Sequence, residues 1–169
     1  MIKYTFGIML VGLLFSSCNR LYYQSDFLVE LDAQDYKSYY TEVQCDDDVN
    51  PTTAQRIIDA VDENCKKIGY TKSDDGDLLI KYLIKNTSRQ FVEECVQEYG
   101  RFSGGEYCRE RVVTYKEGSL IIDIINADTN EIVWHGAAYG PSFNDWKDAD
   151  SKVNEMVGTL FQRYTSNTK

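Results

Sequence analysis

The most constraining feature is a pair of apolar runs on either side of a short polar turn. The run LIIDIIN ends at Asn126, the run EIVWHGAAYG spans residues 131–140, and ADTN lies between them. Asp and Asn favour tight turns, and Val and Ile favour strands. The sequence therefore predicts an antiparallel β-hairpin whose apolar face must pack against other elements.

Two further stretches carry apolar residues at helical spacing. The first starts where Asn50 can cap and Pro51 fits the first turn, and Gly69 stops it. The second is expected to be capped between Asp148 and Ser151. Their apolar positions are Ala54, Ile57, Ile58, Val61, Cys65 and Ile68 in the first helix, and Val153, Met156, Val157, Leu160, Phe161 and Tyr164 in the second.

Two other segments, 35–43 and 78–86, read as strands, and the first strand of the hairpin extends back over 108–126, where Gly118 predicts a bulge or a break. This order of elements predicts an α+β fold: an antiparallel sheet of about four or five strands with two amphipathic helices packed on one face. We expect this single domain to span residues 31–166.

The N-terminal residues have the layout of a signal peptide. Lys3 precedes an apolar run too short to cross a bilayer comfortably, and Ser16 and Ser17 lead to Cys18. This pattern predicts a lipoprotein signal peptide over residues 1–17, a lipid-modified Cys18 that anchors the protein to a membrane, and a tether over 18–30. A secreted protein cleaved near Ser17 and a retained membrane anchor are the alternatives.

Composition narrows the possible partners. Without residues 1–17 the chain keeps 152 of its 169 residues, and the loss of Lys3 takes its net charge from −9 to about −10. Such an acidic chain is not expected to bind nucleic acid through charge. The 13 tyrosines and 2 prolines favour an ordered, β-rich domain.

Four cysteines follow Cys18, an even number in a chain predicted to be exported. Cys95 and Cys108 flank a glycine-bearing loop between two strand-like runs, which favours a local disulfide. A second bridge between Cys45 and Cys65 is a weaker hypothesis, because Cys65 lies on a predicted apolar helix face and can equally be a buried thiol.

Residues for catalysis or metal binding are sparse. His135 is the single histidine, has no serine or cysteine motif beside it, and fits a sheet-surface position. The acidic clusters 46–48 and 74–77 lack a complete calcium loop and fit solvated turns. We expect no catalytic residue, metal or cofactor. The tyrosines could line a binding groove on the open sheet face or simply cover it, with Tyr36, Tyr39, Tyr82 and Tyr115 as candidate partner-binding residues.

Several segments resemble, in the same order, a bacterial lipoprotein family called domain of unknown function 4136. They are YKSYY, the helix ending in KKIGY, DLLIKY, EGSLIIDIINADTNEIVWHG and the closing amphipathic helix. The resemblance implies export, lipid anchoring and an α+β fold, and it implies no reaction. The residues also suggest scaffold roles: Trp134 to seal the sheet against a helix, Gly136 to permit close packing, and Asp123 and Asp128 to organise the hairpin.

These features predict a lipid-anchored, non-enzymatic binding or structural protein at the outer membrane, facing the periplasm. Its expected partner is an envelope protein or a small apolar ligand. The alternative is an envelope hydrolase that uses paired carboxylates drawn from Asp46, Asp48, Asp74 and Asp77.

Overall fold

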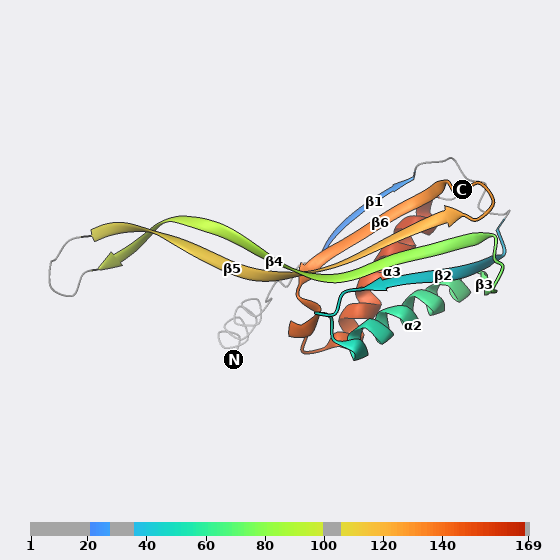
Figure 1. Cartoon of the computed structure of the whole chain (residues 1–169), viewed down its shortest axis with the longest axis horizontal. Coiled ribbons are helices and arrows are strands. Elements are labelled where there is room, and N and C mark those ends of the chain that lie inside the picture. The colour runs from blue at the N-terminus through green and yellow to red at the C-terminus, as the bar shows by residue number, and fades with distance from the viewer. Residues whose placement is uncertain (1–20, 28–35, 100–105, 168–169) are drawn as a thin grey trace, which may run out of the picture.

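The structure is a computed structural model that describes residues 21–27, 36–99 and 106–167, with side chains omitted for 94–99, 106–109 and 167. One sheet carries the fold, with two long helices on one side of it (Figure 1). The strands are β1 (Tyr22–Phe27), β2 (Ser38–Cys45), β3 (Thr71–Lys72), β4 (Leu78–Tyr99), β5 (Glu106–Asn126) and β6 (Ile132–Pro141), and the helices are α2 (Pro51–Lys67) and α3 (Ala149–Asn167), with a short 3₁₀ turn, η2 (Phe143–Asp145).

The sheet is six-stranded and mixed, with the order β1-β6-β5-β4-β2-β3. The predicted α+β class is confirmed, but the strand count and the purely antiparallel arrangement were wrong. β2 runs parallel to both β3 and β4, because α2 carries the chain back along the sheet after β2. The sixth strand, β1, comes from residues 22–27, which were predicted to be a tether and which pair with β6.

Both helices form as their sequence signals predict. The Asn50 side chain accepts a hydrogen bond from the Thr52 amide at 2.9 Å, and Pro51 occupies the first turn of α2. Gly69, at a φ of 95°, ends that helix in the left-handed conformation that glycine adopts at little cost. Asp148 accepts from the Ser151 amide at 3.3 Å at the start of α3.

The core lies between the helices and every second residue of the central strands. Its largest member is Trp134, which is fully buried and meets Tyr164 of α3 edge to face at a centroid distance of 5.5 Å. A Cβ on Gly136 would overlap the Trp134 ring, so the glycine lets the indole lie flat against β6. The predicted sealing role of Trp134 and the close packing at Gly136 are confirmed.

Hairpin details differ from the prediction. Asn126 organises the turn, because its side-chain oxygen accepts from the amides of Asp128 and Thr129 at 2.9 and 3.1 Å. Asp123 contacts His135 across the two strands of the hairpin, which agrees with its predicted role there. Gly118 does not break β5: it pairs with Asn86 and Gly140, and the space left by its missing side chain is taken by the Phe143 ring.

Candidate interaction surface

β4 and β5 are 22 and 21 residues long, and their far ends project well beyond the helices as a two-stranded arm (Figure 1). We define the arm as residues 87–99 of β4 and 106–116 of β5. Two-stranded ribbons are marginally stable alone in water, and an exposed sheet edge invites pairing with another chain. We therefore treat the arm as the candidate interaction surface of the fold.

Neighbouring strands stop at the base of the arm for identifiable reasons. β2 pairs with β4 only as far as Cys45 opposite Ile84, where the chain turns into α2. β6 pairs with β5 only as far as Pro141 opposite Glu117, and proline has no amide hydrogen with which to continue a ladder. Beyond the Ser142 amide, which donates to the Lys116 carbonyl at 3.2 Å, no strand of the described ranges borders the arm.

Both faces of the arm expose large apolar side chains. Val92 and Val112 lie opposite each other on the face that continues from the core, and they are 54% and 62% exposed. Phe91 and Tyr115 lie on the other face, 49% and 46% exposed, with ring centroids 6.1 Å apart. No described residue covers these side chains, and apolar area exposed to water is a source of binding energy.

Charged residues of opposite sign face each other across the two strands of the arm. Glu93 of β4 is opposite Arg111 of β5, and both are exposed. Closer to the base, Arg89 of β4 contacts Glu117 of β5 at 3.3 Å. β5 adds the exposed Lys116. The arm therefore carries exposed charges of both signs in addition to apolar area.

Three of the four tyrosines expected to bind a partner lie away from the arm. Tyr39 and Tyr82 are fully buried beneath the helices, and Tyr39 donates to Asp62 of α2 at 3.2 Å. They point to the core because their positions on β2 and β4 belong to the rows that face the helices. Tyr36 is half-buried and accepts a hydrogen bond from Asn126 at 3.0 Å. Only Tyr115 is on the candidate surface.

Five residues form a row across the sheet face opposite the helices. Strand register aligns Glu42, Lys81, Asp123, His135 and Asp26 on β2, β4, β5, β6 and β1. Lys81 contacts Glu42 at 2.9 Å, and His135 Nδ1 lies 2.6 Å from Asp123. The imidazole has a carboxylate to orient it, but this row contains no hydroxyl or thiol that it could activate as a nucleophile.

The two acidic clusters lie at opposite ends of β2. Asp77 accepts hydrogen bonds at 2.9 Å from the Lys37 amide, the Ser38 amide and the Ser38 hydroxyl, so it ties the start of β2 to the start of β4. These donors hold the pKa of Asp77 below its usual value. Within the described part of the chain, no group of three or more His, Cys, Asp or Glu residues could hold a metal ion.

Cys45 and Cys65 are both free, so the proposed bridge between them was wrong. Cys65 of α2 is buried beside Tyr39, at the beginning of β2. Cys45 ends the same strand, six residues and roughly 20 Å further along it than Tyr39. A disulfide requires Cα atoms within about 7 Å. Burial and the nearby Asp62 carboxylate raise the pKa of the Cys65 thiol to about 12.

The bridge between Cys95 and Cys108 stays a prediction. β4 and β5 do bracket the loop, with Cys108 opposite Gln97 and Cys95 within the irregular stretch between Glu93 and Val96. The side chains of Cys95 and Cys108 lie outside those described. Cys18 and the rest of the leader also lie outside the described residues, and no described helix is long and apolar enough to cross a membrane.

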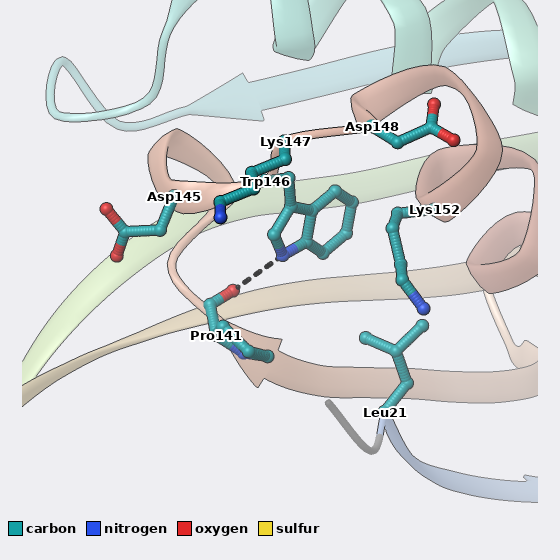
Figure 2. A pocket seen from close by; sticks show the side chains of 7 residues that line it. All are labelled: Leu21, Pro141, Asp145, Trp146, Lys147, Asp148 and Lys152. Carbon is teal, nitrogen blue, oxygen red and sulfur yellow. Dashed lines mark hydrogen bonds between the residues drawn. The ribbon is translucent and has the colours of Figure 1, made fainter. Parts of the chain in front are cut away.

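A cavity of about 300 Å³ lies near the base of the arm, where β1 begins (Figure 2). Trp146 lines the cavity, and its indole N–H donates a hydrogen bond to the Pro141 carbonyl at 3.1 Å. Leu21 closes one side and packs on Gly140. The remaining polar groups, two carboxylates and two amines, are spread around the rim, and the lining is Leu21, Pro141, Asp145, Trp146, Lys147, Asp148 and Lys152.

The apolar arm positions Phe91, Val92 and Val112 were not predicted from the sequence to form a surface. A signal was available. The pairs FV at 91–92 and VV at 112–113 lie in strand-like runs on both sides of that loop. Their cross-strand match becomes visible only once the register is known.

Fold and surface together define an α+β protein with a mixed sheet and a projecting β-arm. The chain belongs to the family described as Domain of unknown function (DUF4136), whose model matches residues 23–164. This confirms the resemblance inferred from the sequence. The match begins within β1, in agreement with that strand's place in the domain.

Solved structures share the fold at low sequence identity. The PelC dodecamer from Paraburkholderia phytofirmans is similar over 83% of this chain and 94% of the PelC chain, with a TM-score of 0.52 and 10% identity. A PDZ domain protein from Parabacteroides distasonis is similar over 86% of this chain and 36% of its own, with a TM-score of 0.54 and 13% identity. Among curated proteins, no sequence matches this chain.

Proposed function

We propose that this protein is a lipid-anchored, non-enzymatic interaction module of the cell envelope that binds its partner through the arm. The observation that carries the proposal is the exposure of Val92, Val112, Phe91 and Tyr115 on a ribbon that lacks a core of its own. Apolar side chains exposed on both faces of a projecting hairpin are costly for a protein that acts alone and useful for one that associates.

A lipid anchor on Cys18 would place the arm relative to a membrane. Cys18 precedes Leu21 by three residues, which span at most about 11 Å when fully extended. Leu21 lies at the cavity near the base of the arm (Figure 2). A lipid on Cys18 would therefore hold the arm base close to the bilayer surface, with the outer membrane and its periplasmic face as the proposed location.

Arrangement of the acidic groups favours binding over hydrolysis. Asp77 is engaged by three donors near the start of β2, whereas Asp46 and Asp48 follow the other end of that strand. The PelC protein, which has this fold, is a dodecamer. Assembly through protein contacts is therefore a role that the fold can support.

Chemical cross-linking of intact envelopes tests the proposal. Wild-type protein should give cross-linked products that are lost in Val92→Asp/Val112→Asp, while Ile132→Asp, a substitution at an exposed position distant from the arm, should keep them. Cross-links unchanged by the arm substitutions would show that the arm is not the binding element.

A second experiment tests the lipid anchor. Cys18→Ala should accumulate as uncleaved precursor and fail to partition into detergent.

A further inference from the structure

We propose that the partner of the arm is a second copy of this chain, with the free edge of β5 in one copy pairing antiparallel with the free edge of β4 in the next. This inference rests on the proposed function and names the partner of the same surface. Four observations support it. They are the outer edges of β4 and β5 in the arm, the regular strand segments at these edges, the apolar cross-strand pairs and the positions of the charged residues.

The backbone of the arm has two edges to satisfy. Antiparallel strands direct alternate amide and carbonyl pairs to each side, so each arm strand has groups that its hairpin partner does not use. Such rows of unpaired groups are templates for strand addition. Because β4 and β5 run in opposite directions, a neighbouring arm aligned alongside continues one antiparallel sheet.

The regular part of each edge covers the same level of the arm. β4 is regular from Thr87 to Glu93, after which an irregularity before Val96 interrupts the register. β5 is regular over Arg111 to Lys116, the residues that face Ser88 to Glu93. A bulge twists a strand and blunts its edge, so the segment available for pairing is the half of the arm nearest the sheet.

Side-chain rows in this segment repeat across the proposed interface. Within one arm Val92 faces Val112, and Phe91 faces Val113. When arms lie side by side at equal height, each row extends into the next copy as a continuous apolar band. The exposed side chains of both faces then gain apolar neighbours, since every arm has another arm on each edge.

The charged pair Glu93 and Arg111 favours a contact between β5 of one copy and β4 of the next. Glu93 is opposite Arg111 within the arm, so a β5-to-β4 contact gives an alternating row in which each Arg111 also meets the Glu93 of the next copy. Arg89 likewise meets Tyr115 in the row nearer the base, a contact that permits a cation–π interaction.

Pairings related by two-fold symmetry satisfy these features less completely. A contact between two β5 edges leaves both β4 edges uncovered, and a contact between two β4 edges leaves both β5 edges uncovered. The β5-to-β4 contact is heterologous, because it joins two different edges. It can therefore repeat from copy to copy, and the copies form a ring when the last one pairs with the first. A closed set of arms has no free edge.

Charge-reversed variants of the full, lipid-modified protein test the pairing by mixing. In detergent, Glu93→Lys and Arg111→Glu should each lose the multimeric mass of wild-type protein, because each places like charges both within and between arms. An equimolar mixture should recover it. Where the two variants alternate, Arg111 of one meets Glu93 of the other, and the two substituted positions, which carry opposite charges, also meet. Light scattering corrected for bound detergent reports the mass.

Two controls keep the test interpretable. Glu131→Lys reverses an exposed charge in the turn far from the arm and should leave the multimer intact. The double variant Glu93→Lys/Arg111→Glu should assemble as wild type, which shows that the altered arm still forms. Circular dichroism verifies the fold of each single variant.

A wild-type protein that is monomeric at all accessible concentrations would overturn the inference, as would single variants that assemble normally or a mixture that stays dissociated. Envelope cross-links separate this outcome from the proposed function. If the protein is monomeric but Val92→Asp/Val112→Asp still abolishes a cross-link to another protein, self-pairing is wrong and the interaction role stands. If both the multimer and the cross-link are absent, both proposals fall.

Discussion

Val92 and Val112 face each other across the arm, yet both side chains remain more than half exposed. A cross-strand pair at the centre of a sheet would be covered by a second layer, and here the helices end before this level of the hairpin (Figure 1). The pair therefore contributes little to the fold of one chain and is available to another.

Replacing both valines by threonine should separate association from folding. Threonine keeps the branched shape and strand preference of valine, so we expect the free energy of unfolding to change by less than about 0.5 kcal/mol. Because each substitution exchanges a methyl group for a hydroxyl, self-association should weaken at least about tenfold. Sedimentation velocity together with urea unfolding measures both quantities. A Val92→Thr/Val112→Thr protein that associates as tightly as wild type would contradict the role of this pair.

Gly136→Ala should destabilise the domain. The added Cβ overlaps the Trp134 ring, which is fully buried and cannot move freely, and such overpacking costs about 1–3 kcal/mol. Gly158→Ala in α3 is the matched control, because a Cβ there meets nothing within 4 Å and alanine is the better helix former. Urea unfolding should show opposite signs for the two variants, and an unchanged midpoint for Gly136→Ala would argue against this packing.

Cys65 should resist alkylation in the folded protein. Its thiol is fully buried, and with a pKa of about 12 it holds almost no reactive thiolate at about pH 8. Cys45 is exposed and should be labelled first. Peptide mass mapping after brief iodoacetamide treatment, with and without urea, checks this order. Equal labelling of both thiols in the native protein would mean that α2 does not cover Cys65.

Asp77 should make stability depend on acidic pH. Its pKa is lowered in the folded state by the Lys37 and Ser38 donors, so its contribution is complete above the ordinary carboxyl pKa of about 4 and is lost as pH falls through the folded value. Asp77→Asn should therefore lower the melting temperature at about pH 7 more than at about pH 3. Asp75→Asn serves as the control. The same difference in melting temperature between wild type and Asp77→Asn at both pH values would contradict this assignment.

Local signals in the sequence were sufficient for much of the fold. The cap at Asn50, the stop at Gly69 and the apolar face of each helix depend on residues close together along the chain, and the structure confirms them. The Trp134 hairpin was also recognisable, because two apolar runs flank one short turn.

Relationships between distant segments could not be read in the same way. β1 is short and partly polar, and it is stabilised by pairing with β6, which lies far away along the chain. Tyr39 and Tyr82 carry an aromatic ring suited to either face of a sheet, and only the register decides that both lie under the helices. The arm was missed for the same reason: its apolar residues become a surface through cross-strand alignment.

The most direct measurement of the central claim is the mass of a protein without its arm. Replacing residues 88–116 by Asn-Gly would join Thr87 to Glu117, which are paired in the sheet, through a turn that suits a two-residue hairpin. We predict that this lipid-modified variant is folded and monomeric in detergent, whereas the full protein is multimeric. A folded variant with the same multimeric mass as the full protein would contradict the account.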